Sequence, residues 1–185
     1  MRRTLSVVLA AVACAGITAC GEDKPTSSAE SEGVYFTVGG LRYQVQVSRP
    51  LNPKAVEDRD YFRGIASSQA SLDPTSTWFG VFVRARDVGQ VPARSADLEA
   101  FKIVDTQDDE YFPIPVDNVL AYTPATHAPK GDLPDQDAIA RFGPTQGALL
   151  LFKIPNASLE NRPLELEVEA PGAATPRKGN VILDV

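Results

Sequence analysis

The chain has 185 residues, with 18 Lys and Arg against 24 Asp and Glu, so its net charge is −6. An acidic surface of this kind disfavours binding to nucleic acid and to anionic lipid surfaces. Fifteen prolines and thirteen glycines favour a loop-rich β protein over a helical one.

The N-terminus has the pattern of a secretory signal. Arg2 and Arg3 form a short positive segment, and thirteen uncharged residues follow from Leu5 to Ile17. A helix of that length would reach only about 20 Å, which is too short to span a hydrocarbon core of about 30 Å. The segment therefore indicates export, and it does not indicate a signal anchor.

The end of this run, Ile17-Thr18-Ala19-Cys20, resembles the lipobox of bacterial lipoproteins. The resemblance implies that the signal is residues 1–19 and that Cys20 carries a diacylglyceryl thioether. The alternative is an ordinary signal cut near Ala19. The Arg2-Arg3 pair leaves twin-arginine export open beside Sec export, although Ser6 stands where that motif favours an apolar residue.

Residues 20–33 are predicted to be the lipidated cysteine and a flexible tether. Residues 21–33 contain no apolar side chain larger than Ala or Pro, so they bury too little surface to offset the entropy of ordering. The folded domain is then residues 34–185, which is the size of one domain with a full core. Removing Arg2 and Arg3 leaves 16 basic and 24 acidic side chains, a charge of −8.

The two cysteines exclude thiol chemistry in the mature chain. Cys14 would be lost with the signal and Cys20 would be acylated. A disulfide, a cysteine nucleophile and a cysteine-based zinc site are therefore excluded, and the domain must be stabilised by its core alone.

The first predicted strands form a hairpin. In residues 41–48, Leu, Tyr and Val alternate with Arg, Gln and Ser, which is typical of a half-buried strand. Residues 34–38 precede it, and Gly39-Gly40 predicts the turn between the two.

Two later segments, 78–86 and 148–154, are apolar on both faces, which is typical of central strands or strands covered by loops. Gly80 inside the first is predicted to allow the close approach of a bulky ring, with Trp78 as the candidate.

Three segments supply the remaining strands. Residues 101–114 predict a hairpin whose turn runs from Asp105 to Asp109. Residues 164–170 alternate Leu and Val with Glu, and these glutamates would discourage pairing with another sheet if the strand lies at an edge. Residues 180–185 predict a last strand.

The expected fold is an all-β, immunoglobulin-like antiparallel β-sandwich of about seven to nine strands, with a β-barrel as the alternative. Short helices are expected from Asn52-Pro53 toward Gly64 and from Asp135 to Arg141. The segment 115–147 has five prolines and few core residues. It is predicted to be a crossover between sheets, and a binding loop is the functional alternative.

The Trp near the start of a strand, the "FKIVD…YFPI" hairpin and the C-terminal "QGALLLFKIP…NRPLELEV" pair resemble a family of bacterial lipoproteins of unknown function with a telokin-like, immunoglobulin-like fold. The resemblance covers most of residues 34–185. It implies the fold and an extracytoplasmic location, and it implies no catalytic residues and no cofactor.

Candidate chemical groups are few. His127, the only histidine, is predicted to be exposed in a loop, with no G-x-S-x-G motif to accompany it. Oxygen-rich clusters can bind calcium, and the weak candidates are Asp105, Asp108, Asp109, Asp132, Asp135 and Asp137. Neither cluster has EF-hand spacing, so solvated turns are the preferred interpretation.

The sequence therefore predicts a non-enzymatic lipoprotein on the extracytoplasmic side of the cell membrane. Its anchor would be the lipid on Cys20, and its partner an envelope protein or another extracellular ligand, with no nucleic acid. A calcium- or ligand-binding accessory of an envelope enzyme or transporter is the alternative function.

Overall fold

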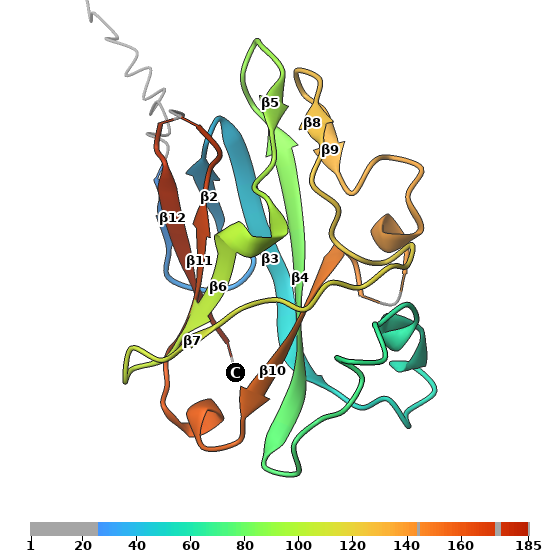
Figure 1. Ribbon diagram of the computed structural model, residues 1–185. Helices are drawn as coiled ribbons and strands as arrows, with labels where there is room; N and C mark the ends of the chain where they lie inside the picture. Colours follow the sequence, from blue (N-terminus) through green and yellow to red (C-terminus); the bar gives the residue numbers. More distant parts are fainter. Residues whose placement is uncertain (1–25, 144, 173–174, 185) are drawn as a thin grey trace, which may run out of the picture.

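Two β-sheets face each other in the computed structural model, which describes residues 26–143, 145–172 and 175–184 (Figure 1). In the first sheet, sheet A, the strands have the order β1-β12-β11-β6-β7. Their bounds are Ser28–Ala29 (β1), Lys178–Leu183 (β12), Leu164–Glu169 (β11), Phe101–Val104 (β6) and Glu110–Tyr111 (β7).

The second sheet, sheet B, has the order β10-β4-β3-β2, and a further strand, β9, also pairs with β4. The bounds are Ala148–Pro155 (β10), Ser76–Asp87 (β4), Leu41–Leu51 (β3), Tyr35–Val38 (β2) and Asp132–Leu133 (β9). A small ribbon pairs Ala93–Arg94 (β5) with Thr126–His127 (β8).

The predicted all-β, immunoglobulin-like sandwich is confirmed. Seven strands have four residues or more, and the strands of the described residues form separate sheets that do not close into the alternative barrel. Among the described residues, no helix has the length and apolar character needed to cross a membrane.

The predicted hairpins are present. Val38 pairs with Leu41 across a two-residue turn, and both turn glycines, Gly39 and Gly40, have positive φ, the conformation that a tight hairpin turn requires. In the second hairpin, Val104 of β6 pairs with Glu110 of β7 around the predicted aspartate turn.

Strand β10 pairs along its whole length with residues 76–83 of β4, and residues 78–83 and 148–152 are buried on both faces, as predicted. One face of β4 places Phe79, Val81 and Val83 in the core between the sheets. The opposite face places Trp78 and Phe82 in a second apolar cluster with Leu51 and Tyr61. This second cluster covers only one half of the outer face of sheet B, because β4 continues beyond it with Arg84 and Arg86.

The interpretation of Gly80 is corrected in one respect. The backbone is closely approached at this point, but by the side chain of Leu51, because a Cβ atom on Gly80 would lie 2.7 Å from Leu51 Cδ1 and 3.1 Å from Leu149 Cδ1. Trp78 instead stacks edge-on against Phe62, with the ring centroids 5.4 Å apart.

The folded part of the chain begins before residue 34, which corrects the predicted boundary between tether and domain. Ser28 and Ala29 form β1, which pairs with Asn180 and Val181 of β12, and Ala29 is buried. This pairing is parallel, against the expectation of antiparallel pairing throughout. Residues 26–33 contain no large apolar side chain that would have indicated a strand. The segment joins the sheet mainly through backbone hydrogen bonds, such as the one from the N–H of Asn180 to the carbonyl of Ser27.

Three other details differ from the sequence predictions. The glutamate-rich strand β11 lies between β12 and β6, so its glutamates do not protect an edge. The expected helices are single 3₁₀ turns, Arg59–Phe62 (η1) and Ile139–Arg141 (η3). The other 3₁₀ turns of the described chain are Leu98–Ala100 (η2) and Ser158–Glu160 (η4).

The segment 115–147 is the predicted crossover, since it leads from β7 in sheet A to β10 in sheet B. It carries β8, β9 and η3, and it is pinned to the body by the Tyr122 N–H bond to the Leu149 carbonyl. Through β9 and η3 it also forms one wall of a surface groove on sheet B.

Candidate functional site

A groove of about 390 Å³ opens on the outer face of sheet B, next to the second apolar cluster. We call it the arginine groove. It is lined by Tyr35, Arg42, Arg84, Ala85, Arg86, Val88, Asp132 and Arg141. Four elements build it, because Tyr35 belongs to β2, Arg42 to β3, two arginines to β4, and the last two residues to the 115–147 crossover.

Strand register brings the arginines together. Arg42 of β3 is paired directly with Arg86 of β4, and Arg84 is paired with Gln44, two residues further along the same face. Side chains paired across antiparallel strands have Cβ atoms about 4.5–5.5 Å apart, and like charges in such a pair destabilise the sheet. The arrangement therefore costs stability, so the stability of the sheet does not explain it.

One carboxylate, Asp132, lies at the wall of the groove. It is 3.7 Å from Arg86 Nε and 3.1 Å from Arg141 Nη1, and its side chain is only 15% exposed. Arg141 also donates to the carbonyl of Pro134, so both wall residues are held in place.

The other two guanidinium groups of the groove belong to Arg42 and Arg84. Arg42 lies over the ring of Tyr35, 5.9 Å from its centroid. Within residues 26–143, 145–172 and 175–184, no ion pair links Arg42 or Arg84 to a carboxylate. Four guanidinium groups and one carboxylate give this groove a local charge of +3, in a chain whose net charge is −6.

The calcium candidates are divided among different sites. Asp132 is the ion-pair partner in the arginine groove, Asp135 lines a neighbouring cleft, and Asp137 lies two residues further along the same loop. In the part of the chain that the structure describes, no group of three or more His, Cys, Asp or Glu side chains is placed to hold a metal ion.

Asp105 organises the β6–β7 turn. Its Oδ1 atom accepts the N–H groups of Gln107 and Asp109, and Oδ2 accepts the amide of Asn161 at 3.2 Å. Burial on its own raises the pKa of this carboxyl, but these hydrogen bonds outweigh it and hold the pKa below its usual value. Asp108 adopts φ 65°, and the aspartates of this tip thus serve the turn.

His127 is not the exposed loop residue that the sequence predicts. It is 6% exposed, because β8 pairs with β5 and turns its ring inward. Its Nε2 atom is buried without a hydrogen-bond partner among the described residues. The ring contributes to a cleft of about 240 Å³ that is lined mainly by small apolar side chains, Leu133, Ala140 and Ala148 among them.

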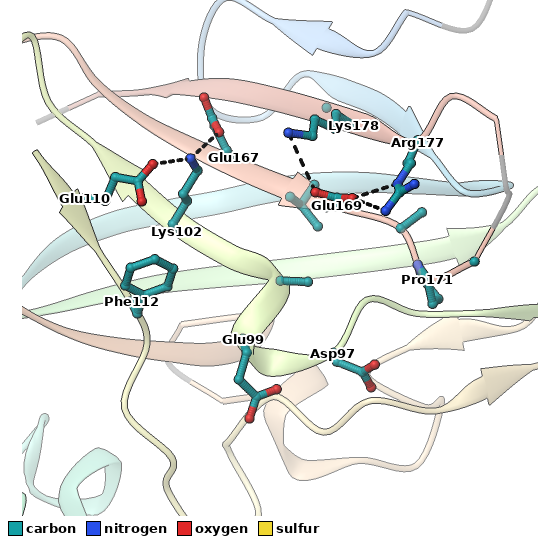
Figure 2. A pocket seen from close by; sticks show the side chains of 15 residues that line it. Asp97, Glu99, Lys102, Glu110, Phe112, Glu167, Glu169, Pro171, Arg177 and Lys178 are labelled. Carbon is teal, nitrogen blue, oxygen red and sulfur yellow. Dashed lines mark hydrogen bonds and ion pairs between the residues drawn. The ribbon is translucent and has the colours of Figure 1, made fainter. Parts of the chain in front are cut away.

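A third hollow, of about 420 Å³, lies on the outer face of sheet A, and its three basic side chains are ion-paired with acidic neighbours. Figure 2 shows Lys102 between Glu110 and Glu167, and Glu169 facing Arg177 and Lys178. Hydrogen bonds to Glu110 and then to Glu167 raise the pKa of Lys102. This ladder satisfies its own cations, so the arginine groove is the better candidate for binding.

Cys20, the predicted site of lipidation, lies outside the described residues. The four groove arginines are functional candidates that sequence reasoning missed. The signal for them was the spacing of Arg84 and Arg86 by two on a predicted strand, which places both side chains on one face.

No protein-family model matches the chain, and no curated protein matches it. Two solved structures are similar in fold. The yjhA protein from Bacillus subtilis has a TM-score of 0.56 and 14% identity, covering 84% of this chain and 99% of its own. An uncharacterized β-sandwich protein from Clostridium difficile 630 has a TM-score of 0.42 and 10% identity, covering 86% of this chain and 97% of its own. The first likeness supports the sandwich fold alone.

Proposed function

We propose that this chain is a lipid-anchored, non-catalytic binding module of the cell envelope, facing the extracytoplasmic side. The arginine groove would be its binding surface, and the acylated Cys20 would be its attachment to the membrane. The partner would be an envelope component or another extracellular ligand.

The observation that carries the binding role is the concentration of four arginines in one walled groove of an acidic protein. Two of them are opposed across neighbouring strands. A sheet that had only to be stable would place a neutral or acidic side chain opposite Arg42. The anchor is supported by the Ile17-Thr18-Ala19-Cys20 pattern, which ends the uncharged N-terminal run.

A fractionation experiment tests the anchored location. Wild type and Cys20→Ala are expressed in a bacterial host, and membranes are separated from soluble extract. We expect the wild type in the membrane fraction and released only by detergent, since two acyl chains give stable anchoring. We expect Cys20→Ala to be released or to accumulate as a precursor. Mature Cys20→Ala protein retained in membranes as fully as wild type would contradict the proposal.

A further inference from the structure

We infer that the arginine groove is a binding site for phosphate groups. This inference rests on the proposed binding function and names the ligand chemistry of the same surface. It starts from charge, because a local excess of three positive charges in an acidic chain selects an anionic ligand of more than one charge.

The type of cation favours phosphate. All four basic groups are arginines, whose planar guanidinium forks donate paired hydrogen bonds to oxyanions. Arg86 and Arg141 are steadied by Asp132, whereas Arg42 and Arg84 have no carboxylate partner among the described residues. A tetrahedral phosphate can accept from guanidinium groups on several sides at once, and the opposed pair on β3 and β4 offers such an arrangement.

Tyr35 adds an apolar wall. Its ring lies under Arg42, and the residue is 49% exposed. A half-exposed aromatic ring beside guanidinium groups can pack against the carbon skeleton that carries a phosphate. The groove volume of about 390 Å³ lies within the range of small-ligand sites, about 300–1,000 Å³.

The groove lies at the end of the sandwich where the described chain begins. The Thr37 N–H bonds to the carbonyl of Thr26 at 2.7 Å, Thr37 is paired with Arg42, and Arg42 with Arg86. Figure 1 shows β2, the end of β4 and β9 at this same end. Six residue steps separate Cys20 from Thr26, a reach of at most about 22 Å. Phosphate could therefore come from a lipid headgroup or from a free phosphate ligand.

The test uses the full chain purified in a neutral detergent, titrated calorimetrically with tripolyphosphate. The test variant is Arg42→Gln/Arg84→Gln. The matched control is Lys54→Gln/Arg59→Gln, which removes the same charge from two exposed positions outside the groove. We expect saturable 1:1 binding by wild type, at least tenfold weaker binding by the test variant, and a change below twofold in the control.

Absence of saturable binding by wild type, or equal weakening in both variants, would overturn the inference. Citrate supplies a carboxylate probe of similar charge, and citrate binding as tight as tripolyphosphate binding would overturn the assignment to phosphate. The thermal midpoint, measured without ligand, checks that all variants are folded.

A second arm separates the two sources. Micelles containing phosphatidylglycerol replace tripolyphosphate, and binding that is lost in Arg42→Gln/Arg84→Gln would identify a headgroup site. Binding of tripolyphosphate alone would identify a free phosphate ligand. The anchoring proposal has a separate readout, the acylation state of Cys20 in the purified chain. An unacylated Cys20 would refute the anchor, and the titration would still test phosphate binding by the arginine groove.

Discussion

Two tyrosine hydroxyls lie inside the core between the sheets. Tyr43 accepts the N–H of Ala96 at 3.0 Å, and Tyr122 donates to the carbonyl of the same residue at 2.8 Å. Burial raises the pKa of Tyr43 to about 12 and raises the pKa of Tyr122 as well. The two hydroxyls thus tie the segment that leads into η2 to the sandwich. Tyr122 must stay protonated to donate its hydrogen bond, and burial disfavours the charged form of both tyrosines.

This burial predicts a loss of stability in alkali. Tyrosines of the unfolded chain titrate near pH 10, so the stabilising effect is fully present below pH 10. It is lost progressively as the pH rises from about 10 through about 12, the folded-state value of Tyr43. Urea unfolding of wild type and Tyr43→Phe between pH 8 and pH 12 measures the effect. The variant should show a shallower decline, and identical slopes would contradict this assignment.

Gly80 is a second residue for which we predict an effect on stability, because its lack of a Cβ atom leaves room for neighbouring side chains. A Cβ atom there would press on Leu51 and Leu149 inside the second apolar cluster. We expect Gly80→Ala to lower the free energy of unfolding by about 1–3 kcal/mol, as overpacked cores do. Gly143→Ala is the control, because its nearest neighbour would be 3.6 Å away. Equal free energies of unfolding for Gly80→Ala and wild type would contradict this prediction and would show that Leu51 and Leu149 can move to accommodate the methyl group.

At the scale of the strand, the Arg42–Arg86 pair predicts a stability gain on substitution. Arg42→Thr removes a like-charge pair, although it also removes the contact with Tyr35. We expect the free energy of unfolding to rise by about 0.2–1 kcal/mol at low salt. The gain should shrink at high salt, where the repulsion is screened. Urea unfolding at two salt concentrations provides the measurement, and a clear loss of stability would mean that Arg42 serves the fold.

The alternating strands could be predicted from sequence because their physical cause is local. In β3 and β11, side chains alternate between the core and solvent, and two positive-φ glycines turn the first hairpin. Strand β1 could not be predicted, because it is held mainly by backbone bonds to β12, about 150 residues away in sequence. The central position of β11 could not be predicted either, because it depends on which distant strands, β12 and β6, pair with it.

The candidate site was less predictable than the strands. The grouping of Arg42 with Arg86 depends on the register of β3 against β4, which includes a shift between Val45 and Val47. Arg141 joins them only because Asp132 bridges β9 and η3. The burial of His127 likewise depends on the β5–β8 ribbon, whose two short strands have no recognisable pattern.

For the whole molecule, the structure predicts that residues 26–33 contribute to stability. A chain that starts at residue 34 would lack β1 and would leave the N–H of Asn180 without the Ser27 carbonyl. Compared with a chain that starts at residue 26, its free energy of unfolding should be lower by about 1–3 kcal/mol. Urea unfolding of both chains measures the difference. Equal free energies of unfolding would contradict a structural role for residues 26–33 and would support a tether that ends at residue 33.

The start of the described chain and the arginine groove lie at the same end of the molecule. The described chain begins beside β2, one strand away from Arg42, so an anchor at Cys20 would hold the arginine groove close to the membrane surface. If Cys20 is acylated as proposed, the lipid and the arginine groove would lie toward the same end of the domain.

The most direct test of the central claim is the intact mass of the chain purified from bacterial membranes, with sequencing of its N-terminal peptide. The account predicts a mature chain that begins at Cys20 and carries the added mass of a diacylglyceryl group on that residue. A chain that retains Met1 and the leader, or one that begins at an unmodified residue, would contradict it.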